Sequence, residues 1–94
     1  MLSKIPILLD RIDAGNRDKE ILRAGLIAEY DAINLYEQMA SLAESEDIKK
    51  VMLDVAKEEK EHVGEFQTLL LRMDKEQVEE MNGGKEEVEE LIEK

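Results

Sequence analysis

The chain has 94 residues, with 24 Asp and Glu against 13 Lys and Arg, and a formal net charge of −11 at pH 7. Its length allows one small domain, and its acidity disfavours nucleic acid and anionic membranes as partners, because both would repel it. The absence of cysteine excludes disulfides and iron–sulfur clusters, and the abundance of helix-favouring residues predicts an all-α fold.

Residues 1–16 are predicted to form an N-terminal arm, which the breaker pair Gly15-Asn16 closes. The apolar run IPILL within this arm is interrupted by Asp10 and Arg11. It is therefore too short for a signal-peptide core or for a membrane span of about 18 apolar residues. We expect a cytoplasmic protein with no membrane-spanning segment.

A first long helix is predicted over residues of about 18–44, where mostly apolar or small residues recur at alternating three- and four-residue spacing. This seam consists of Leu22, Gly25, Glu29, Ala32, Tyr36, Met39 and Ala43. The charged side chain of Glu29 interrupts the seam at its middle.

A second long helix is predicted over residues of about 46–73, with Ser45 as its N-cap and acidic residues in its first turn. Its seam consists of Ile48, Met52, Val55, Glu59, His62, Phe66, Leu69 and Met73. Glu59 and His62, the single histidine of the chain, interrupt this seam at its middle as well.

The remaining residues, 75–94, are predicted to form short C-terminal helical segments, with Gly83-Gly84 ending a short third helix. No segment shows the alternation typical of a strand. Residues 1–94 are thus interpreted as a single domain built around an antiparallel two-helix hairpin.

The three interruptions fall at one height of this hairpin. Glu29 lies roughly 16 residues before the turn, and Glu59 and His62 lie roughly 14 to 17 residues after it, which at about 1.5 Å per residue is the same level. Glu59 and His62, three residues apart, also share one helix face. The three side chains are therefore predicted to converge.

Carboxylates and an imidazole that converge in an apolar seam are typical of a metal site, because buried charges need a compensating cation. Glu29, Glu59 and His62 are the predicted ligands, and they are half of the set found in dimetal four-helix bundles. Two helices cannot enclose their own seams either. A homodimer would complete both the bundle and the site.

Other interpretations stay open at this point. A metal-free helical assembly or adaptor module could use the same polar groups to fix its register. A dimetal peroxidase or a manganese protein could use the same ligands. Tyr36 fits either core packing or a hydrogen bond to a ligand carboxylate. The off-seam acids Glu58, Glu61 and Glu65 are interpreted as solvated.

The stretches AEYDAINLYEQMA and DVAKEEKEHVGEFQTLLLRMD resemble the encapsulated ferritins, half-length members of the ferritin-like superfamily. The resemblance covers about residues 20–84 and rests on two motifs. Glu29 is followed seven residues later by Tyr36, and Glu59-x-x-His62 is followed by Val-Gly-Glu-Phe. Rubrerythrins share the ligand set, but they carry an additional domain with cysteine pairs that this chain lacks.

This resemblance implies a ferroxidase, which oxidises Fe(II) with oxygen at a di-iron site formed between subunits. It further implies rings of dimers, typically decamers, enclosed in an encapsulin shell, with metal-ligand roles for Glu29, Glu59 and His62 and a site-adjacent catalytic role for Tyr36. The family's acidic iron-entry positions are matched only in part: Asp31 could serve, but Ala28 stands where an acid is expected.

The C-terminal stretch KEEVEELIEK does not resemble the short apolar encapsulation peptide of such cargo proteins. Some relatives are instead fused directly to the shell protein. We therefore expect either a piece of such a fusion or a protein that works without a shell.

Overall fold

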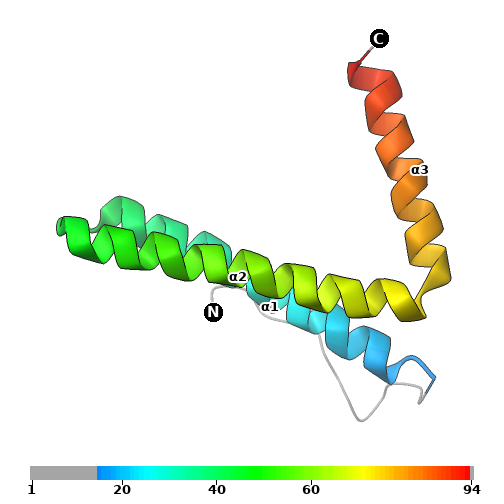
Figure 1. The fold of residues 1–94 in the computed structure, drawn as a ribbon, viewed down its shortest axis with the longest axis horizontal. Helices are drawn as coiled ribbons and strands as arrows, with labels where there is room; N and C mark the ends of the chain where they lie inside the picture. Colours follow the sequence, from blue (N-terminus) through cyan, green and yellow to red (C-terminus); the bar gives the residue numbers. More distant parts are fainter. Residues whose placement is uncertain (1–14, 94) are drawn as a thin grey trace.

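The structure is a computed structural model that describes residues 15–93. Its helices are α1 (Arg17–Leu42), α2 (Glu46–Met73) and α3 (Lys75–Ile92). Helices α1 and α2 lie antiparallel and side by side, and α3 turns sharply away from the end of the hairpin (Figure 1). The described part of the chain contains no strand, so the predicted all-α fold is confirmed.

The observed ends of the two long helices agree with the predicted ones to within two residues. The predicted N-terminal arm lies outside the described residues except for Gly15 and Asn16, which form a turn just before α1. Within residues 15–93, no helix combines the length and the hydrophobicity that crossing a membrane requires.

The turn between α1 and α2 is set by two local features. Ala43 has an extended backbone, with φ −68° and ψ 142°, which ends α1. The Ser45 hydroxyl accepts a hydrogen bond from the Ile48 N–H at 3.3 Å, so the predicted N-cap of α2 is confirmed. Glu46 and Asp47 follow in the first turn, where negative charge suits the helix dipole.

The side chains buried inside the hairpin are Ile33 and Ala40 of α1 and Ala56 and Leu70 of α2. None of these residues belongs to the predicted seams, whose members are half-buried or exposed. Leu69 of the α2 seam, for example, is 48% exposed. The apolar surface of each helix thus includes the seam and the buried residues beside it. In the hairpin, each long helix covers only one flank of the apolar surface of the other. The other flank is open to solvent in the single chain.

Gly25 marks a close approach between the two long helices. A Cβ atom at this position would lie 3.2 Å from Cδ2 and from Cε2 of the Phe66 ring, closer than an ordinary van der Waals contact. A glycine inside a helix costs about 0.5–1 kcal/mol relative to alanine. The close contact with Phe66 explains why a glycine occupies position 25 in spite of this cost.

The prediction that Gly83-Gly84 ends a third helix is wrong, because α3 continues through both glycines to Ile92. A glycine ends a helix when it adopts the left-handed conformation at the C′ position, and no described glycine has a positive φ. The residues on either side favour helices, and Lys85 pairs with Glu89 at 3.8 Å. The helix propensity of these neighbours and the ion pair together outweigh the entropy that the two glycines lose in a helix.

Asp74 joins all three helices where α3 begins. Its side chain is buried; Oδ1 accepts the Gln77 N–H at 3.0 Å and caps α3, and Oδ2 accepts a hydrogen bond from Arg23 of α1 at 3.0 Å. The hydrogen bond from Gln77 is the main cause that lowers the pKa of Asp74, and burial opposes it. Lys19 and Arg23 lower this pKa further.

This lowered pKa predicts an acid-sensitive junction. The ionised Asp74 contributes stability above its unfolded pKa of about 3.9, and this contribution is lost as the pH falls through the lower folded pKa. Hydrogen exchange of α3 amides from pH 7 to pH 3 should therefore show protection that falls in acid. Asp74→Asn should lack that part of the pH dependence, and an unchanged profile in this variant would contradict the assignment.

Candidate metal centre

Glu29 of α1 and Glu59 and His62 of α2 meet between the two long helices. One possible ligand atom from each residue lies within 4.8 Å of the other two. His62 Nδ1 is 3.3 Å from Oε2 of Glu59 and 3.4 Å from Oε2 of Glu29. The structure thus brings together the three residues whose convergence the sequence predicts.

The two carboxylates of this cluster are mostly buried. The side chains of Glu29 and Glu59 are 16% and 19% exposed, whereas the His62 side chain is 43% exposed. Oε2 of Glu29 is fully buried and makes no hydrogen bond to any described residue. A buried acceptor without a hydrogen bond destabilises the fold by roughly 1–3 kcal/mol when it is neutral and by more when it is charged. A bound cation would offset this penalty at Oε2 of Glu29.

The two distances from His62 to the carboxylates are compatible with a bound metal ion. Two ligand atoms that each lie about 2.1 Å from one ion are about 3.0 Å apart at a right angle and about 3.4 Å apart at a tetrahedral angle. The separations of His62 Nδ1 from the two carboxylate oxygens, 3.3 and 3.4 Å, are in this range. Two carboxylates and an imidazole suit iron, manganese or zinc.

Tyr36, the other predicted site residue, lies on α1 about two turns beyond Glu29 and is half-buried. Within the described residues, no hydrogen bond joins its hydroxyl to Glu29, Glu59 or His62. Its role beside the site therefore stays a prediction. The off-seam acids Glu58, Glu61 and Glu65 are all exposed, as expected for solvated side chains.

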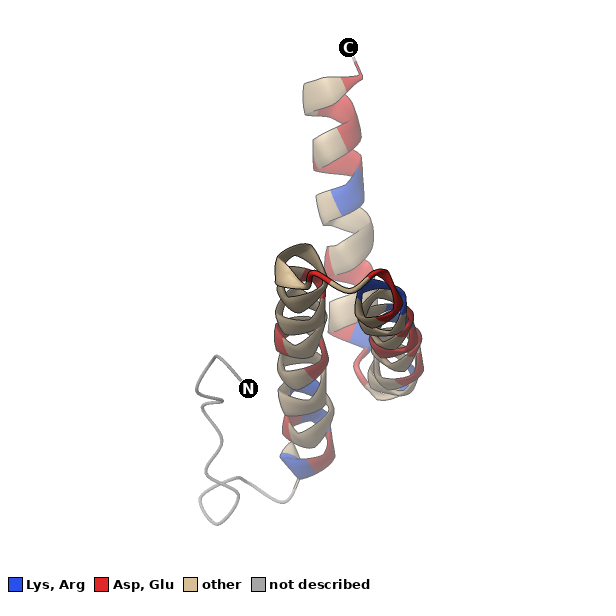
Figure 2. Ribbon diagram, turned by 90° about the vertical axis from the view of Figure 1, so that its left-hand side faces the viewer, with Lys and Arg blue, Asp and Glu red and all other residues tan. Residues whose placement is uncertain are grey.

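The electrostatic environment of the cluster favours cations. Acidic residues are spread along the helices and outnumber basic ones (Figure 2), in keeping with the net charge of −11. A surface of this kind raises the local concentration of positively charged ligands. The surface therefore attracts dissolved divalent metal ions and repels anions.

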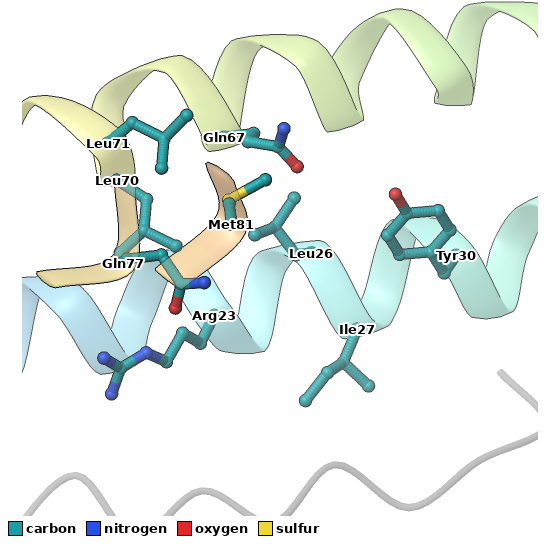
Figure 3. Close-up of a pocket in the computed structure, with 9 residues that line it drawn as sticks. All are labelled: Arg23, Leu26, Ile27, Tyr30, Gln67, Leu70, Leu71, Gln77 and Met81. Atoms are coloured by element: carbon teal, nitrogen blue, oxygen red, sulfur yellow. The ribbon is translucent and has the colours of Figure 1, made fainter. Parts of the chain in front are cut away.

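A separate open groove of about 380 Å³ lies where the three helices meet (Figure 3). Most of its lining is apolar, and its one charged residue, Arg23, is paired with Asp74. The groove is lined by Arg23, Leu26, Ile27, Tyr30, Gln67, Leu70, Leu71, Gln77 and Met81. Among the described residues that line the groove, no acid–base pair or set of metal ligands converges, so the cluster of Glu29, Glu59 and His62 remains the candidate site.

Sequence reasoning gave no role to the contact between Gly25 and Phe66, which lies next to this cluster. Gly25 is four residues before Glu29, and Phe66 is four residues after His62. The signal in the sequence was a glycine and an aromatic residue on the same helix faces as the predicted ligands. Only the structure brings the two residues within contact distance of each other.

Several known proteins are similar to this chain in sequence and fold. Residues 20–93 match the protein family described as rubrerythrin. A ferritin-like–encapsulin shell fusion protein of Pyrococcus furiosus is 57% identical over 93 residues, 97% of this chain and 27% of the fusion protein. An encapsulin nanocompartment cargo protein of Myxococcus xanthus, EncC, is 41% identical over 56 residues, 60% of this chain and 43% of the cargo protein. This chain spans less than half the length of either relative.

The fold has a close counterpart among solved structures. The crystal structure of the encapsulated ferritin domain from Pyrococcus furiosus matches with a TM-score of 0.84 and 54% sequence identity. The match covers 100% of this chain and 98% of that one. The chain therefore belongs to the rubrerythrin family of ferritin-like proteins, and its resemblance to the encapsulated ferritins is confirmed.

Proposed function

We propose that this chain is a ferroxidase subunit that oxidises Fe(II) to Fe(III) with oxygen at a di-iron site held by Glu29, Glu59 and His62. The observation that carries this proposal is the buried Oε2 of Glu29, which accepts no hydrogen bond from residues 15–93 and lies 3.4 Å from His62 Nδ1. A metal ion between these atoms would satisfy the carboxylate.

We further propose that the site is shared by two chains. Three protein ligands are too few for two iron ions, and the cluster is open on the side where His62 is 43% exposed. The same flank exposes apolar seam residues, such as Leu69 at 48% and Met73 at 42%. A second hairpin packed there would cover this surface and add Glu29, Glu59 and His62 of its own, which gives a four-helix bundle.

The proposed reaction uses iron as the substrate. Two Fe(II) ions each give one electron to an oxygen molecule, which takes up two protons and leaves as hydrogen peroxide. The carboxylates of Glu29 and Glu59 stabilise Fe(III) more than Fe(II), because the higher charge is attracted more strongly. The acidic surface supplies Fe(II) and His62 supplies a neutral nitrogen ligand. We place Tyr36 beside the site as a hydrogen-bond donor to a ligand carboxylate.

The setting proposed for this activity is an encapsulin compartment. One relative is named as a fusion with an encapsulin shell, and another as cargo of an encapsulin nanocompartment. A half-bundle subunit has no interior in which to keep oxidised iron, so storage would depend on such a shell. A ring of dimers, a decamer by resemblance, is the assembly that we propose inside it.

The test combines metal stoichiometry with oxygen uptake. Under anaerobic conditions the purified chain should bind one Fe(II) per chain, that is, one di-iron site per two chains. Adding oxygen should then produce the Fe(III) absorbance together with oxygen consumption. Fe(II) binding without oxygen uptake, or tight Mn(II) binding that iron does not displace, would contradict the ferroxidase proposal. Absence of any metal binding would favour a metal-free assembly.

A further inference from the structure

We propose that the contact between Gly25 and Phe66 sets the spacing of α1 and α2 at the metal centre, which makes Gly25 a positioning residue for Glu29. The proposal rests on the metal-binding function proposed above. Neither Gly25 nor Phe66 carries a metal-binding group, so their contribution is to hold the two helices at a given separation.

The contact lies one turn away from the metal ligands on both helices. Gly25 precedes Glu29 by four residues, and Phe66 follows His62 by four residues, so each shares a helix face with its ligand. Because α1 and α2 are antiparallel, both residues fall on the same side of the cluster. The Phe66 ring is 3.2 Å from the position that a Cβ of residue 25 would occupy.

Packing, rather than backbone freedom, explains the glycine at this position. Gly25 lies inside α1, and no described glycine has a positive φ. The other glycines within the described helices, Gly64, Gly83 and Gly84, would place a Cβ in open space. Gly25 is thus the one described helical glycine at which a side chain would meet another residue.

An added methyl group at residue 25 would act on the metal centre through the position of α1. The contact is tighter than usual, so the Phe66 ring or the whole of α1 would have to move by a few tenths of an ångström. Metal–ligand distances tolerate about 0.2 Å. A shift of α1 by this amount would move Glu29 away from its 3.4 Å separation from His62 Nδ1.

The experiment is an anaerobic titration of the full chain with Co(II), whose visible absorption reports coordination geometry. Gly25→Ala should raise the Co(II) Kd roughly tenfold or more, as the loss of supporting contacts does in other metal sites, and should alter the spectrum. Phe66→Leu alone should also weaken binding, because it removes the ring that keeps the helices apart. Combining Gly25→Ala with Phe66→Leu should restore much of the affinity, because the smaller side chain makes room for the methyl group.

The matched control is Gly64→Ala, which makes the same change on α2 two residues after His62, where nothing lies within 4 Å. It should leave the Kd and the spectrum unchanged. Parent-like Co(II) binding by Gly25→Ala would overturn the positioning role alone, as would a defect that Phe66→Leu does not relieve. If the parent chain binds no Co(II), the proposed metal site fails and the positioning role fails with it.

Discussion

Replacing Glu29 or His62 by alanine is expected to lower the rate of Fe(II) oxidation by more than about 100-fold. Each substitution removes a proposed ligand, and the loss should exceed the 10- to 100-fold effect of removing a residue that only supports a ligand. Stopped-flow absorbance of Fe(III) formation, together with oxygen-electrode measurements, would report the rate. Parent-like rates in both variants would show that the cluster is not the oxidation site.

Two controls separate the loss of a ligand from damage to the fold. Glu61→Ala removes an exposed carboxylate next to His62 in the sequence and should leave the rate nearly unchanged. The metal-free Glu29→Ala chain should be at least as resistant to urea as the parent, because it no longer buries a carboxylate oxygen that accepts no hydrogen bond from the described residues. A marked drop in its free energy of unfolding would indicate a structural role for Glu29 instead.

Leu69→Glu is expected to give a folded chain that stays monomeric and does not oxidise iron. Leu69 is 48% exposed and belongs to the same α2 seam as Glu59 and His62. A charge there would have to be buried when a second acidic hairpin covers this flank, and its burial would cost several kcal/mol. Sedimentation velocity and Fe(II) oxidation, measured on the same sample, would check both parts of the prediction.

Leu53→Glu provides the matched control, because Leu53 is on the same helix and is similarly exposed, at 52%. It lies nine residues before His62, which at 100° per residue places it on the opposite face of α2. This variant should dimerise and oxidise iron as the parent does. A fully active monomer from either variant would rule out a site shared between two chains.

Much of the hairpin could be predicted from local features of the sequence. The three- and four-residue spacing gave the two long helices, and Ser45 with the acids after it gave the start of α2. A turn at this point places Glu29, Glu59 and His62 at one height, and the structure has them within 4.8 Å of one another. These features depend on backbone geometry that is nearly the same in every helix.

Prediction from local patterns failed where neighbouring residues outweighed a helix-end signal and where two partners lie far apart in the sequence. Gly83-Gly84 has the composition of a helix end, but a run of helix-favouring neighbours carries α3 through it. Arg23 and Asp74 are 51 residues apart, and nothing in their surroundings in the sequence marks them as partners. Their pairing requires α3 to begin beside α1, which is a property of the whole fold.

The sequence by itself determined that polar residues interrupt two apolar seams at matching positions and that a single chain contains only half of a dimetal ligand set. Periodicity identifies a helical face, but it does not determine how far each helix is rotated about its axis. The tertiary structure decided that rotation: the hairpin buries Ile33 and Ala56, and it leaves the flank of His62 open. The tertiary structure also decided the spacing of α1 and α2. The contact that we propose sets this spacing joins Gly25 of α1 to Phe66 of α2, and these residues are neighbours only in the folded chain.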